Sequence, residues 1–77
     1  MQTQKTDVTK PSENFGANVR RALIKKERSA GWLAKKTGIT HARIREIFDG
    51  EDPAIDESVR ICNVLDVSLS AMCKSDT

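Results

Sequence analysis

Apolar residues recur at helical spacing along most of the chain, which predicts an all-α protein. The clearest pattern lies in SAGWLAKKTGITHARIREIFDG, which predicts a short helix over 29–37 and a second helix over 40–49. Ser29 and Thr40 are suitable N-caps, because a hydroxyl oxygen can accept from the free amides of a first helical turn. Gly38 falls between the helices, where a left-handed backbone favours glycine. The segment therefore predicts two helices joined by a tight corner.

Further patterns predict helices on both sides of this pair. A first helix is expected from about Ser12 to about Arg28, and a fourth from an Asp56 cap to about Leu65, before a last short helical turn that starts at 66–68. The apolar stripe of the first helix is Phe15, Val19, Ala22, Leu23 and the stem of Lys26. The inner stripe of the fourth is Val59, Cys62 and Leu65, with Ile61 beside it.

The start of the chain differs in composition from the rest. Residues 1–12 carry almost no apolar side chains, and Pro11 is expected to interrupt any helix, so this segment is predicted to be a disordered arm. Lys5 and Lys10 could touch phosphates, whereas an inert tail is the simpler interpretation. The chain of 77 residues is expected to form one small domain with a modest core.

The spacing of small and apolar residues around the corner is that of a helix-turn-helix. Ala34, Gly38 four residues later, Ile39, and Ile44 with Ile47 in the next helix resemble the lambda-repressor/Cro-like (XRE) DNA-binding domains. The similarity extends from about Asn14 to Met72. It implies a compact five-helix domain over 13–74, with the helix-turn-helix at 29–49, a disordered arm at 1–12 and a tail at 75–77.

The same resemblance implies that the N-terminal end of the helix over 40–49 enters the major groove, where each base pair presents a distinct set of donors and acceptors. Ile44 and Ile47 are expected to point inward. His41 can donate to guanine, Ala42 can contact a thymine methyl group, and Glu46 can accept from cytosine N4, while Arg45 can reach guanine or a phosphate. The predicted base-reading residues are Thr40, His41, Ala42, Arg45 and Glu46.

The predicted phosphate contacts lie mainly on the helix over 29–37, because the free amides of a helix N-terminus attract anions. They are Ser29, Ala30, Lys35, Lys36 and, from the flank of the next helix, Arg43. Two positions depart from the family pattern: the glutamine that often opens the helix is Ala30, and the asparagine that often ends the next one is Asp49. We therefore expect an affinity that is modest and sensitive to salt.

Charge is divided unevenly along the chain, although the net charge is only +2. Between Arg20 and Arg45 there are nine basic residues and one acidic residue, whereas from Glu46 onward there are two basic and eight acidic residues. The basic segment coincides with the predicted helix-turn-helix, as expected for a surface that faces a polyanion. A solvated helix face is the alternative interpretation of such a charge run.

The chain differs from the family at three positions, and other residues of the chain are expected to compensate for each difference. In many relatives an arginine at the position of Leu23 pairs inside the domain with a glutamate at the position of Phe48. Both residues are apolar here, so we predict a contact between Leu23 and Phe48 in place of the ion pair. Trp32 is expected to fill the gap where the family usually has a leucine and this chain has Arg28. A protein-partner contact is the alternative for Trp32.

The C-terminal turn carries more apolar side chains than so short a segment can keep in water. Some are expected to close the core, and the others to pack against a second copy, because family dimers often associate through this region. The resemblance therefore implies a weak homodimer, or one induced by DNA, that presents two recognition helices to half-sites about 34 Å apart. The predicted dimer residues are Val67, Leu69 and Met72.

The leading hypothesis is sequence-specific binding of a double-stranded DNA operator by a small Cro-like transcription regulator, a repressor that acts by occupancy. Size and resemblance suggest a phage or prophage origin. The second hypothesis is an antitoxin-like or adaptor module that uses the same helical fold. In that case the acidic loop over 50–53 and Trp32 contact a protein partner. The departures from the family pattern at Ala30 and Asp49 motivate this hypothesis.

No pattern in the sequence predicts an enzyme, a cofactor or a metal site. There is no phosphate-binding GxxxxGK[ST] loop, and the single histidine, His41, has no ligand cluster at metal-binding spacing. Cys62 and Cys73 are interpreted as reduced core thiols. No apolar run approaches the ~20 residues that span a bilayer, and the polar start lacks a signal-peptide core. We therefore expect a cytoplasmic protein without membrane association or a small-molecule ligand.

Overall fold

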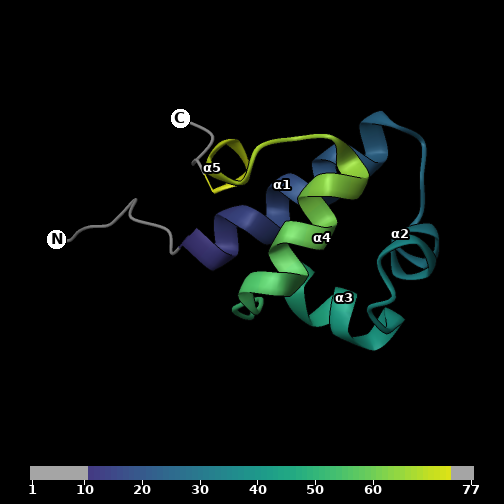
Figure 1. Cartoon of the computed structure of the whole chain (residues 1–77), viewed down its shortest axis with the longest axis horizontal. Helices are drawn as coiled ribbons and strands as arrows, with labels where there is room; N and C mark the ends of the chain where they lie inside the picture. Colours follow the sequence, from purple (N-terminus) through teal and green to yellow (C-terminus); the bar gives the residue numbers. More distant parts are fainter. Residues whose placement is uncertain (1–10, 74–77) are drawn as a thin grey trace, which may run out of the picture.

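Five helices account for most of residues 11–73, the part of the chain that the computed structural model describes. They are α1 (Pro11–Lys25), α2 (Ala30–Thr37), α3 (His41–Phe48), α4 (Ile55–Leu65) and α5 (Leu69–Met72). Figure 1 shows α4 in front of α1, with α2 on the right, α3 below and α5 on the left. The predicted all-α, five-helix fold is thereby confirmed. None of the helices within residues 11–73 is long and apolar enough to cross a membrane.

The start of α1 includes the last two residues of the predicted arm. α1 begins at Pro11, so this residue opens the helix instead of interrupting it. Proline is tolerated in a first helical turn because the N–H that it lacks would have no intrahelical acceptor there. The rest of the predicted arm, with Lys5 and Lys10, and the predicted tail at 75–77 lie outside the described residues.

The end of α1 comes three residues earlier than predicted, at Lys25. Glu27 adopts a left-handed conformation with φ of 57°, and the Arg28 N–H donates to the Leu23 carbonyl at 2.9 Å. Such a reversal closes a helix C-terminus. The predicted apolar stripe extends to the stem of Lys26, but that residue lies beyond the helix and is exposed, so this part of the prediction is wrong.

The core is built mainly from the apolar stripes of α1, α3 and α4. Phe15, Val19 and Leu23 of α1 are at most 3% exposed, and Ile44 and Ile47 of α3 are completely buried. Burial of each such side chain contributes about 1.5–3 kcal/mol relative to an exposed position. The other buried apolar residues are Leu33, Ile39, Ile61, Cys62, Leu65 and Met72. This packing decides which face of α3 remains outside.

α1 and α3 approach each other closely at Gly16. A Cβ atom on Gly16 would lie 2.2 Å from the Ile47 carbonyl oxygen and 3.2 Å from the Phe48 Cα. Only a residue without a side chain permits this distance. The sequence pattern did not single out Gly16, because an isolated glycine in a helical segment normally indicates only a weaker helix.

The aromatic residues at the edge of the core are covered by arginines. Phe48 and Trp32 are half-buried and pack against the core, so the structural interpretation of Trp32 is confirmed. The Arg28 guanidinium lies 5.1 Å from the Trp32 ring centre, and the Arg20 guanidinium lies 5.7 Å from that of Phe48. A direct contact between Leu23 and Phe48 stays a prediction.

The inner face of α4 differs from the predicted one. Val59 is 44% exposed, and the buried stripe is instead Ser58, Ile61, Cys62 and Leu65. Ser58 can face inward because its hydroxyl donates to the Ile55 carbonyl at 2.8 Å, which satisfies this polar group within the helix. The helix also begins earlier than the predicted Asp56 cap, since Ala54 is its N-cap residue.

α5 is fastened to α1 by side-chain amides. Asn18 donates to the Met72 carbonyl at 2.6 Å, and Asn14 donates to the Cys73 carbonyl at 3.2 Å. These bonds satisfy two carbonyl groups at the C-terminal end of α5 that accept no hydrogen bond from within the helix.

Cys62 and Cys73 are free thiols, the first buried and the second half-buried, and burial raises the pKa of Cys62.

α3 and α4 are joined by an ion pair between Arg43 and Glu57. The Arg43 Nε donates to both Glu57 oxygens at 3.1 and 3.2 Å, and its Nη2 donates to Glu57 Oε1 at 3.0 Å. The Ala54 N–H donates to the same carboxylate at 2.8 Å, which closes the first turn of α4. Arg43 and the Ala54 N–H lower the pKa of Glu57, and the carboxylates of Glu57 and Glu46 raise the pKa of Arg43.

Gly16→Ala is expected to lower the free energy of unfolding by at least about 2 kcal/mol, because the α1 and α3 backbones must move apart. Gly31→Ala is the matched control, since a Cβ there would meet only Ser29 Oγ at 3.7 Å. Alanine also favours a helix over glycine by about 1 kcal/mol. Urea unfolding of both variants tests the difference. Equal stability of the two variants would contradict the close contact at Gly16.

Glu57 is expected to contribute to acid unfolding. A carboxylate with a lowered pKa in the folded state stabilises the fold above its unfolded-state pKa, and this contribution is lost as pH falls through the folded-state pKa. Glu57→Gln should therefore lose less stability than the wild type between about pH 5 and about pH 2. Glu51→Gln, in the exposed loop before α4, should keep the wild-type acid dependence. Thermal unfolding across this pH range measures both.

Candidate nucleic-acid interface

The corner between α2 and α3 is held by its own backbone and capping side chains. Ser29 Oγ accepts from the Trp32 N–H at 3.0 Å, and Thr40 Oγ1 accepts from the Arg43 N–H at 3.2 Å. Gly38 has a left-handed φ of 77°, and its N–H donates to the Ala34 carbonyl at 2.9 Å. The predicted caps and corner are confirmed.

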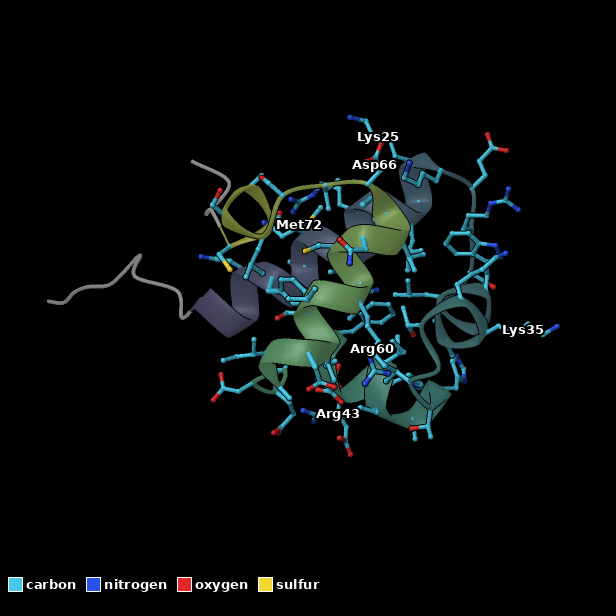
Figure 2. The ribbon with its side chains drawn as sticks, in the orientation of Figure 1. Lys25, Lys35, Arg43, Arg60, Asp66 and Met72 are labelled. Carbon is cyan, nitrogen blue, oxygen red and sulfur yellow. The ribbon has the colours of Figure 1, made fainter. Side chains whose placement is uncertain are left out.

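Two further residues secure the corner, and the sequence reasoning missed both. The Thr37 hydroxyl donates to the Leu33 carbonyl at 2.8 Å and accepts from the Ile39 N–H at 3.2 Å. Arg60 of α4 donates to the Thr37 carbonyl at 3.1 Å and to Asp56 at 2.5 Å. Figure 2 shows Arg60 between α4 and the corner. For Arg60, the sequence signal is its four-residue spacing from Asp56, which indicates an ion pair within one helix. That spacing does not reveal the bond from Arg60 to α2.

The outer side of α3 carries the residues predicted to read bases. Ile44 and Ile47 have no exposed surface, so they fix the orientation of the helix. Helical spacing places Ala42, Arg45 and Glu46 opposite the isoleucines and His41 on the flank, while Thr40 caps the start of the helix. The exposed residues are Thr40, His41, Ala42, Arg45 and Glu46.

An open cleft joins this side of α3 to the start of α2. It is lined by Ser29, Gly31 and Lys35 from α2 and its cap, and by Thr40 and His41 from the start of α3. The cleft therefore brings predicted phosphate-contacting and base-reading residues into one continuous surface.

The predicted phosphate contacts differ in what they offer. Ser29, Lys35 and Lys36 are exposed, and Figure 2 shows Lys35 extending away from the body of the protein. Ala30 is half-buried and packs against the core, and its methyl side chain has no polar group to offer a phosphate. Its backbone N–H, like that of Gly31, belongs to the first helical turn and lacks an intrahelical acceptor. Such amides attract anions.

Arg43 is used inside the domain, although its position predicts a phosphate contact. Besides the bonds to Glu57, its Nη1 donates to Glu46 at 3.1 Å and its Nη2 donates to the Asp52 carbonyl at 2.8 Å. The side chain is only 29% exposed. Figure 2 shows Arg43 between α3 and the start of α4. Glu57 and the Asp52 carbonyl belong to a later part of the chain, so no local spacing identified them, whereas Glu46 lies one turn away on the same helix.

The charge along the surface formed by α2, α3 and the loop after α3 changes sign from one end to the other. Lys35, Lys36 and Arg45 are exposed cations in α2 and α3. Asp49, Glu51 and Asp52 are exposed at the opposite end, between α3 and α4. A polyanion is therefore attracted mainly to the side formed by α2 and Arg45.

Comparison with known proteins agrees with this geometry. A family model described as helix-turn-helix matches residues 19–72, which is more than half of the chain and includes the corner and the two helices that it joins. A search of the curated proteins found no match. The chain therefore belongs to the lambda-repressor/Cro-like family of helix-turn-helix DNA-binding domains.

Proposed function

We propose that this protein binds double-stranded DNA with sequence specificity and acts as a small Cro-like repressor that occupies an operator. The observation that carries the proposal is the orientation of α3. Its isoleucines are completely buried, while His41, Ala42 and Arg45 are exposed, and His41 lines a cleft that continues to the start of α2. An α-helix with a polar outer face fits the major groove, which is about 12 Å wide.

The residues divide into two roles in this proposal. His41, Ala42, Arg45 and Glu46, with Thr40 at the helix start, read base edges in the major groove. Ser29, Lys35, Lys36 and the backbone N–H groups of Ala30 and Gly31 hold the phosphates and fix the register. Arg43 has no phosphate role here, because its donors are used by Glu57, Glu46 and the Asp52 carbonyl.

We also propose that two copies bind one operator through the C-terminal region. Leu69 is 41% exposed and Val67 is half-buried, so both offer apolar surface to a second copy. Met72 is only 7% exposed and mainly closes the core of its own chain. The remaining surface is small, which fits a dimer that is weak or forms on DNA. A selected DNA site with two symmetric halves would support this arrangement.

Fluorescence anisotropy with a labelled random-sequence duplex tests the proposed function. We expect binding at low salt, with log K falling linearly as log salt concentration rises, because lysine contacts release counterions from the phosphates. An absence of binding at low salt would contradict DNA binding. It would favour an antitoxin-like or adaptor module, for which the exposed acidic loop containing Glu51 and Asp52 would be the contact surface.

Arg45→Ala is expected to weaken the binding free energy for a selected operator by about 1–3 kcal/mol and to relax the preference at one base pair. Binding to a selected operator and to a random duplex is compared. Lys36→Ala is the matched comparison. It should weaken binding to all sequences alike and reduce the salt slope by about 1. Full affinity and unchanged sequence preference in Arg45→Ala would remove Arg45 from the interface.

A further inference from the structure

Arg43 links the recognition helix to α4 through a chain of charged groups. Its guanidinium lies between two carboxylates, that of Glu57 on α4 and that of Glu46 one turn later on α3. Glu57 is the more buried of the two, with its side chain 17% exposed, whereas that of Glu46 is 59% exposed. The chain of contacts thus runs from the α3–α4 junction to the surface proposed to face DNA.

Glu57 fixes the orientation of Arg43. The Arg43 Nε and Nη2 both donate to Glu57, and Nη2 also reaches the Asp52 carbonyl at 2.8 Å. Charge-assisted bonds from two guanidinium nitrogens to one carboxylate are strong and directional. With these nitrogens held on the α4 side, Nη1 is the nitrogen that reaches Glu46, at 3.1 Å.

Glu46 thereby presents its carboxylate at a defined place on the outer side of α3. A glutamate side chain loses much rotamer freedom when it is ordered, so a partner that holds it before binding reduces the cost of using it in recognition. An ionised carboxylate only accepts hydrogen bonds. In the major groove the matching donors are the amino groups of cytosine and adenine.

We propose that Glu57, which lies on α4 and outside the base-reading surface, is a specificity-determining positioning residue that acts through Arg43. It keeps the Arg43 guanidinium away from the DNA phosphates and holds Glu46 as the acceptor for a base amino group. This inference rests on the proposed DNA binding. Without Glu57, Arg43 keeps only its bonds to Glu46 and the Asp52 carbonyl, and its guanidinium turns to phosphates of any sequence and no longer orders Glu46.

Glu57→Gln tests this inference when two measurements are combined. Selection from a randomised duplex library should show the preference at one base pair per half-site falling by about tenfold, as expected for the loss of one base contact. Anisotropy with a random duplex should show stronger binding at low salt and a salt slope that is steeper by about 1, because Arg43 adds a phosphate contact.

Glu51→Gln is the matched control for charge. It removes one negative charge from the exposed loop near the same end of α3, but Glu51 makes none of the Arg43 side-chain contacts described above. This variant should keep the wild-type base preference. The double variant Glu57→Gln/Arg43→Gln should return to the wild-type salt slope while its preference at that base pair remains reduced.

Arg43→Lys provides a second route to the same conclusion if Glu57→Gln proves too unstable to test. A lysine keeps the charge but lacks the fork that contacts Glu57 and Glu46 together, so the preference at the same base pair should also fall. The inference is overturned if the folded variants keep the wild-type base preference while the wild type binds DNA. A wild type that binds no DNA at low salt would instead overturn the proposed function.

Discussion

The close contact between α1 and α3 at Gly16 is the constraint on which the rest of this structure depends. The Ile47 carbonyl oxygen of α3 occupies the space that the Cβ atom of any residue other than glycine would need at position 16. This approach lets Ile44 and Ile47 of the short helix α3 bury themselves completely against α1. The orientation of the exposed side of α3, and with it the surface proposed to read DNA, follows from that packing.

Polar bonds from α4 complete what the apolar core begins. Arg60 supports the corner through the Thr37 carbonyl, and Glu57 supports α3 through Arg43. α4 therefore acts on both helices of the helix-turn-helix without itself carrying a predicted base contact. In so small a domain, where the apolar core gives limited stability, such long-range bonds help to keep the two helices at a fixed angle.

The uneven charge of the chain has two consequences in three dimensions. Basic residues on α2 and Arg45 of α3 provide an attractive field for DNA, whereas the acidic loop after α3 limits it to one side. Acidic residues also compete for the arginines of the same surface, as the contacts of Arg43 with Glu46 and Glu57 show. The number of basic residues in this segment therefore overstates the number of cations free to meet a phosphate.

The sequence by itself determined the five helices, the Ser29 and Thr40 caps, the corner at Gly38 and the burial of Ile44 and Ile47. These features depend on residues within one or two helical turns of each other, so their signals are local. Only the tertiary structure decided the need for Gly16, the inward position of Ser58 in place of Val59, and the intramolecular use of Arg43. Each depends on atoms from a different helix, which no local spacing reveals.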